Sequence, residues 1–170
     1  KNIYKTHDVI NDFFKYIYIF GIKTDYQPYQ VAQFLNQCLY ISLHFHKNIE
    51  CQLDVHSIDI NSNKWQQEIS YVANSGQAFQ ISYFEMYKYI AKDLSLSFFL
   101  YQNGFQNKYL ITELKSMNYL FAIRGENFNN ENIKEVIKST QNQSLLWQLF
   151  KLPIKSWQRA KYLIPDDISF

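Results

Sequence analysis

The chain has 170 residues, of which 47% are apolar and 18% aromatic, and it contains only four Gly and three Pro. This much apolar surface, with so few residues that break regular structure, excludes a disordered or collagen-like chain. Seventeen Lys and Arg against fifteen Asp and Glu give a net charge of +2, so the charge does not by itself require a nucleic-acid or membrane partner.

The N-terminal part of the chain predicts two helices. The first follows Asp8, which can cap it, and ends at Gly21. Its apolar stripe contains Val9, Ile10, Phe13, Phe14, Ile17 and Phe20. The second helix begins at Pro28 and extends to about Ser42, with apolar residues at spacings of three and four. Two helices joined by a short link are typical of the first half of a helix-turn-helix unit.

The middle of the chain predicts two further helices and a hairpin. Residues 44–60 are polar enough for a loop with a possible short strand, and Ser62 can cap a helix over residues 62–73. Another helix is predicted from Ser82 to Leu94. Its shared face contains Phe84, Tyr87, Ile90, Ala91 and Leu94. From residue 96 the apolar period changes to two, so residues 96–112 predict a β-hairpin with Asn103-Gly104 near its turn.

Three helices closed by a hairpin are the element order of a winged helix, with the hairpin as the wing. Residues 113–121 predict one more helix, and the polar stretch at 124–131 predicts a boundary. Three short helical patterns follow, at 133–137, 145–150 and, after Pro153, 154–164. We therefore expect an α+β, mainly helical fold, a tandem winged helix-turn-helix. Residues 1–125 would form the first winged-helix domain, and residues 126–170 a second, reduced one.

The residues that could support chemistry form no convincing site. Four possible metal ligands are His44, His46, Cys51 and His56. Their spacing is looser than the two close pairs of a structural zinc site, so we expect no metal and no other cofactor. Asp54, His56 and Ser57 are neighbours in sequence, but a catalytic triad is assembled in space. Nucleophile-elbow and P-loop motifs are missing from the sequence, so we expect no catalytic residues and a protein that is not an enzyme.

The second half of the chain is mildly basic, because residues 81–170 carry eleven cations and eight acidic residues. The candidate nucleic-acid-binding residues are Lys88, Lys92, Lys108, Lys155, Arg159 and Lys161. Lys interleaved with aromatic residues suits phosphate contact and base stacking, although the same pattern is typical of the solvated face of a helix. Fourteen tyrosines are too many for one core, which favours exposed aromatic side chains at a protein interface.

A family resemblance comes from the segment Gly104-Phe105-Gln106-Asn107-Lys108-Tyr109-Leu110-Ile111-Thr112. It resembles the wing in the C-terminal domain of the Stn subunit of CST, the telomere complex of Ctc, Stn and Ten proteins. The family wing has the pattern Gly-Phe-acidic-Asn-x-Tyr-x-aliphatic-Thr, and this chain departs from it at Gln106. The resemblance covers roughly residues 1–125. The candidate protein-binding residues of the hairpin are Tyr101, Phe105, Asn107 and Tyr109.

The resemblance implies a non-enzymatic interaction module in the nucleus, at the telomere. It would dock on the large OB-fold subunit of CST and on DNA polymerase α-primase, and so support telomeric complementary-strand synthesis. An N-terminal OB-fold, absent from these residues, would pair with the small Ten subunit. The composition is similar to that of ciliate proteins, in which a CST-like set belongs to the telomerase holoenzyme. The alternative is a winged-helix module that binds single-stranded telomeric DNA through Lys and aromatic residues. No membrane partner is expected.

Overall fold

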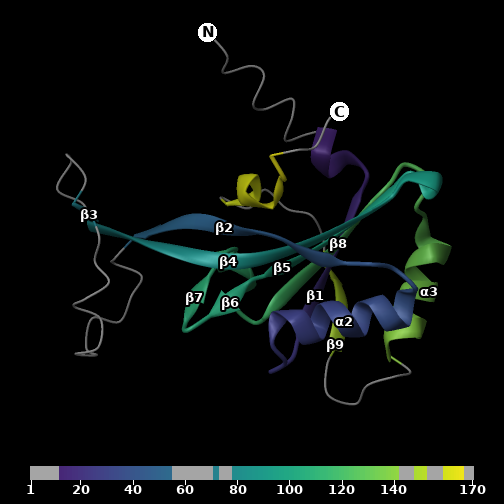
Figure 1. Cartoon of the computed structure of the whole chain (residues 1–170), viewed down its shortest axis with the longest axis horizontal. Helices are drawn as coiled ribbons and strands as arrows, with labels where there is room; N and C mark the ends of the chain where they lie inside the picture. The colour runs from purple at the N-terminus through teal and green to yellow at the C-terminus, as the bar shows by residue number, and fades with distance from the viewer. Residues whose placement is uncertain (1–11, 55–70, 73–77, 142–147, 153–158, 167–170) are drawn as a thin grey trace, which may run out of the picture.

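The computed structural model describes residues 12–54, 71–72, 78–141, 148–152 and 159–166, and their main feature is an antiparallel β-sheet flanked by helices (Figure 1). The expectation of a mainly helical tandem winged helix is therefore wrong. The physical reason is that the three central strands of this sheet, which lie within residues 17–23, 96–102 and 119–124, are buried on both faces. Such strands carry nearly continuous apolar runs, which also satisfy the spacings of an amphipathic helix.

Seven strands form the main sheet. They are β1 (Ile17–Lys23), β2 (His44–Asp54), β3 (Tyr71–Val72), β4 (Ala78–Ala91), β5 (Leu96–Gln102), β8 (Tyr119–Arg124) and β9 (Gln148–Leu152). Their order is β2-β4-β5-β8-β1-β9, with β3 paired to β4, and each pair is antiparallel. A separate two-stranded sheet pairs β6 (Gly104–Phe105) with β7 (Lys108–Tyr109).

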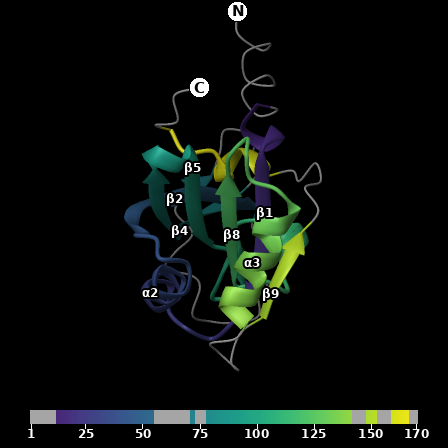
Figure 2. The same cartoon turned by 90° about the vertical axis from the view of Figure 1, so that its right-hand side faces the viewer.

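Two α-helices, α2 (Pro28–Leu39) and α3 (Asn130–Gln141), pack on the same face of the main sheet (Figures 1 and 2). The backbone N–H of Gln27 donates to Oε1 of Gln30 at 2.9 Å, which fixes the start of α2. The side-chain oxygen of Asn129 accepts from the first turn of α3. The helices predicted from Pro28 and over residues 133–137 are thus confirmed. The described residues also contain three short 3₁₀ turns: η2 (Lys92–Leu94), η3 (Thr112–Leu114) and η4 (Ala160–Leu163).

The strands supply side chains to two cores, one on each face of the sheet. In β8, Tyr119, Phe121 and Ile123 belong to the core beneath α2 and α3, whereas Leu120 and Ala122 belong to the core on the other face. That second core is covered by side chains from residues 13–14, from 110–117 and from η4. Because both faces are covered, β8 lacks the alternation of apolar and polar residues that would identify it as a strand from sequence.

The helix predicted for residues 82–94 is the strand β4 followed by the η2 turn. Phe84 and Met86 lie in the second core, while Tyr87 and Ala91 lie beneath the helices. The spacing of three and four that suggested a helix is therefore a by-product of burial on alternate sides. The segment is rich in Tyr and Phe, which favour a pleated surface, and the 11-residue strand β2 pairs with it where a loop with a possible short strand was expected.

Three more segments predicted as helices contain strands. Residues 12–15 are helical, but β1 begins at Ile17, and Gly21 lies within it opposite Leu120 instead of ending a helix. Residues 113–121 divide into η3 and the start of β8, and residues 145–150 overlap β9. Each apolar run is too short for its periodicity to separate a buried strand from a helix.

Residues 96–112 contain a smaller hairpin than the one predicted. β5 pairs with β4 and β8, and only β6 and β7 fold back on each other. The turn lies at Gln106 and Asn107, whose φ angles are 49° and 62°, and not at Asn103-Gly104. Two successive residues with positive φ are typical of a type I′ turn. The hairpin therefore is not the wing of a helical trio.

Strand β9 comes from residues 126–170, yet it pairs with β1 from the N-terminal part of the chain. Residues 1–125 and 126–170 therefore do not have the winged-helix folds that were expected of them. The domain boundary between them stays a prediction. The helix predicted over residues 62–73 lies outside the described residues. Of the helix predicted over 154–164, only residues 159–164 are described, and they contain η4.

Candidate functional site

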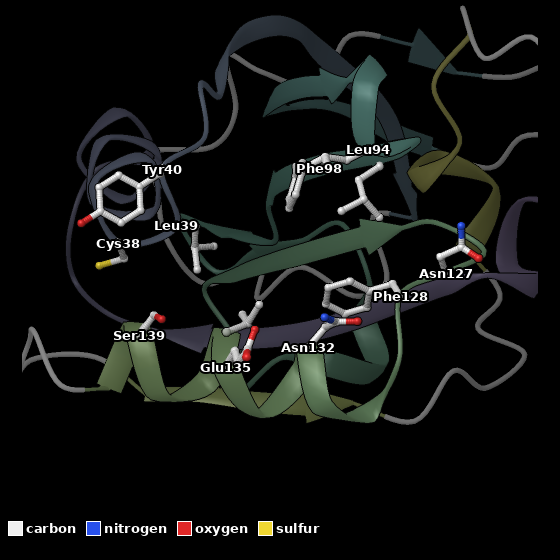
Figure 3. A pocket seen from close by; sticks show the side chains of 12 residues that line it. Cys38, Leu39, Tyr40, Leu94, Phe98, Asn127, Phe128, Asn132, Glu135 and Ser139 are labelled. Atoms are coloured by element: carbon white, nitrogen blue, oxygen red, sulfur yellow. The ribbon is translucent and has the colours of Figure 1, made fainter.

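A groove is present on the helix-covered face of the sheet, between the C-terminal end of α2 and α3 (Figure 3). Four segments line it: the end of α2, η2 with the first residues of β5, the link between β8 and α3, and one side of α3. Its volume is about 380 Å³, which lies within the usual range of about 300–1,000 Å³ for ligand pockets. The groove is therefore large enough for one or two large side chains of a ligand.

The floor of the groove is apolar and well supported. Phe98, Phe128 and Val136 line it and are otherwise buried in the core beneath the helices. The Phe98 ring stacks on Phe121, with 6.4 Å between centroids, and the Phe128 ring packs on Tyr18 at 5.2 Å. These contacts fix the rotamers of both floor rings, so the floor is formed before any ligand arrives.

Two exposed apolar side chains stand at the mouth of the groove. Tyr40, directly after α2, is 95% exposed, and Leu94 of η2 is 65% exposed. Tyr40 has φ 54° and ψ 43°, and Ser95, which follows Leu94, has φ 51°. This left-handed conformation is unfavourable for a residue with a side chain such as Tyr. Exposed apolar groups on strained backbone contribute little to stability, which is typical of residues kept for binding.

We expect replacement of Tyr40 by Gly to stabilise the protein by about 1 kcal/mol, because Gly adopts the left-handed conformation without a steric penalty. Tyr29, in the first turn of the same helix and 61% exposed, provides the matched control. Tyr29→Gly should lower the stability, since Gly is a poor helix former. Urea denaturation followed by circular dichroism measures both changes. A loss of stability in Tyr40→Gly would contradict the assigned strain.

The polar groups of the groove can form hydrogen bonds with a ligand. Asn127, Asn132, Glu135 and Ser139 supply them from the α3 side (Figure 3). Burial raises the pKa of the Cys38 thiol, so this residue is protonated and unreactive near neutral pH. The described lining residues include no His or Lys that could serve as a base beside Ser139 or Cys38.

The structure separates the four candidate protein-binding residues of the hairpin. Tyr101 is fully buried, and its hydroxyl donates to the backbone oxygen of Leu163 at 2.6 Å, so it anchors η4 to the sheet. Phe105 is 49% exposed, Asn107 lies in the exposed turn, and Tyr109 is half-buried. Three of the four can thus reach a partner, whereas Tyr101 cannot without unfolding.

The candidate nucleic-acid-binding residues do not form one patch among the described parts of the chain. Lys88 is only 6% exposed in the sheet, while Lys92 is exposed in η2. Nη1 of Arg159 donates to the backbone oxygen of Tyr109 at 3.2 Å, which brings η4 next to the β6–β7 hairpin. Lys161, also in η4, lies over the Tyr162 ring, and Lys108 is half-buried in β7. Lys155 lies outside the described residues.

The possible metal ligands are not assembled either. His44 and His46 lie on β2, where a β-bulge interrupts the register between Phe45 and Lys47. Cys51 is fully buried, and His56 and Ser57 lie outside the described residues. Across the described ranges, no group of three or more His, Cys, Asp and Glu side chains could hold a metal ion.

Sequence reasoning missed the groove because its lining comes from four segments that are far apart in the chain. The only local signal was Phe128, the single apolar residue in the polar stretch 126–132. An isolated aromatic residue in a polar link often packs onto a core, and here it contributes to the groove floor.

Comparisons with known proteins identify no relative of this chain. No family model, curated protein or solved structure matches it. In the described part of the chain, no helix is long and apolar enough to span a membrane.

Proposed function

We propose that this protein is a non-enzymatic interaction module that binds a segment of another protein in the groove between α2 and α3. The observation that carries the proposal is the pair of exposed apolar side chains, Tyr40 and Leu94, above a preformed apolar floor. An exposed apolar side chain next to a concave apolar surface is typical of a site for peptide recognition.

The telomere assignment has a different basis. Docking on the large CST subunit or on DNA polymerase α-primase was implied by residues 104–112, through their resemblance to a wing. The β6–β7 hairpin retains an exposed Phe105, but it does not stand on a winged helix, so the fold adds no support to that assignment. Membership of a CST-like complex and the single-stranded DNA alternative both stay predictions.

Selection of random peptides of about 12 residues on the full chain tests the proposed docking function. Selected peptides should lose about ten-fold in affinity for Tyr40→Asn and for Leu94→Ser, because each change removes apolar contact area at the groove mouth. Asn tolerates the left-handed conformation of residue 40, so the first variant keeps the fold.

The matched control is Tyr29→Asn, which removes an exposed tyrosine from the other end of α2. Affinity should be unchanged in this control. Peptides that bind the two groove variants as tightly as the native chain would place the binding surface elsewhere and overturn the proposal.

A further inference from the structure

The charge in the described lining of the groove is negative. Among the described residues that line the groove, Glu135 is the only charged one, and none is Lys or Arg. Glu135 forms no ion pair with any other described residue. Its carboxylate is therefore available to a ligand.

The end of α2 adds negative potential at the same place. Cys38, Leu39 and Tyr40 line the groove, so the C-terminal end of the helix is part of its wall. The partial negative charge of a helix lies at this end, and the last turn of α2 contains no basic residue to offset it. The carboxylate and the helix end thus both favour a cation.

We propose that the groove binds a segment of a partner protein in which a large apolar side chain lies next to Lys or Arg. The apolar side chain occupies the floor formed by Phe98, Phe128 and Val136, and the cation pairs with Glu135. An acidic segment is disfavoured, because its carboxylate would face Glu135 and the end of α2, and none of the described lining residues is a cation. This inference rests on the proposed docking function and specifies its ligand.

Three capped peptides test the charge preference. Their sequence is Ser-Gly-Ser-Leu-Phe-X-Leu-Ser-Gly-Ser, with Lys, Gln or Glu at X. Titration into the ¹⁵N-labelled full chain, followed through the backbone amides of Phe98, Phe128 and Val136, gives each Kd. We expect the Lys peptide to bind about five-fold more tightly than the Gln peptide, and the Glu peptide to bind most weakly.

The variant Glu135→Gln should remove the difference between the Lys and Gln peptides. Glu131→Gln, a change one turn earlier on α3 and outside the groove lining, is the matched control and should preserve it. Equal affinity of all three peptides for the native groove would overturn the charge preference and leave the docking function in place. No shift of the groove amides with any peptide would count against both.

Discussion

Replacing Asn103 by Ala should lower the free energy of unfolding by about 3 kcal/mol. Asn103 is fully buried. Its Nδ2 donates to the backbone oxygens of Leu114 and Met117, both at 2.9 Å, and its Oδ1 accepts from the N–H of Ile111 at 2.9 Å. Alanine leaves these three backbone groups without their partner. Chemical denaturation followed by circular dichroism measures the loss.

Asn48→Ala, at an exposed position of β2, is the control and should change stability by less than about 0.5 kcal/mol. A second variant, Asn103→Asp, separates hydrogen bonding from packing because its shape matches that of Asn. One carboxylate oxygen can still accept from Ile111, but the other faces the oxygens of Leu114 and Met117. Its stability should fall at least as far as that of the alanine variant at neutral pH. Native stability in Asn103→Asp would show that the donated bonds contribute nothing.

The Asn103 network also explains why the hairpin is smaller than the sequence suggested. The backbone N–H of Asn103 donates to the oxygen of Asn118 at 2.8 Å, and its oxygen accepts from the N–H of Leu110 at 2.8 Å. These bonds hold residues 110–117 against the sheet and leave β5 free to pair with β8. Asn103-Gly104 has the composition of a hairpin turn, and only tertiary contacts distinguish it from a buried bend.

The elements that the sequence predicts correctly are those with one solvent-exposed face and one buried face. In α2 and α3, buried residues recur at helical spacing, and polar residues occupy the remaining positions. Strand β8 and residues 86–88 of β4 lack that contrast because the sheet is covered on both sides there. A single sequence cannot show how many faces of a segment will be covered, so the period of these strands was hidden.

The groove was beyond sequence reasoning for a related reason. Tyr40 and Leu94 have no common motif, and they line one groove only because the end of α2 and η2 lie at the same end of the sheet. The left-handed conformation of Tyr40 also leaves no trace in the sequence, where Gly or Asn would have indicated it. Binding surfaces assembled from separate segments become visible only with the fold.

Stability should begin to fall near pH 9 and fall more steeply from about pH 10 to about 12, because folding holds the buried thiols of Cys38 and Cys51 and several tyrosines in their neutral forms. Burial raises the pKa of Tyr119 to about 12, and it raises the pKa of Tyr101 well above the ordinary value of 10. The pKa of Tyr87 is also raised, mainly by burial and further by its hydrogen bond to Glu85. Denaturation midpoints across this pH range measure the decline.

The direction of this change in stability follows from the number of protons bound by the folded and the unfolded chain. Above about pH 10 the unfolded chain releases its tyrosine protons while the folded chain retains them, so each unit of pH favours unfolding. Tyr101→Phe should be less stable than the native chain at neutral pH, because the oxygen of Leu163 loses its donor, but its stability should fall less steeply in alkali. The phenolate absorbance of the buried tyrosines should rise together with the loss of the circular dichroism signal. A midpoint that stays constant to about pH 12, or an equal slope in Tyr101→Phe, would contradict the burial of these hydroxyls as the cause.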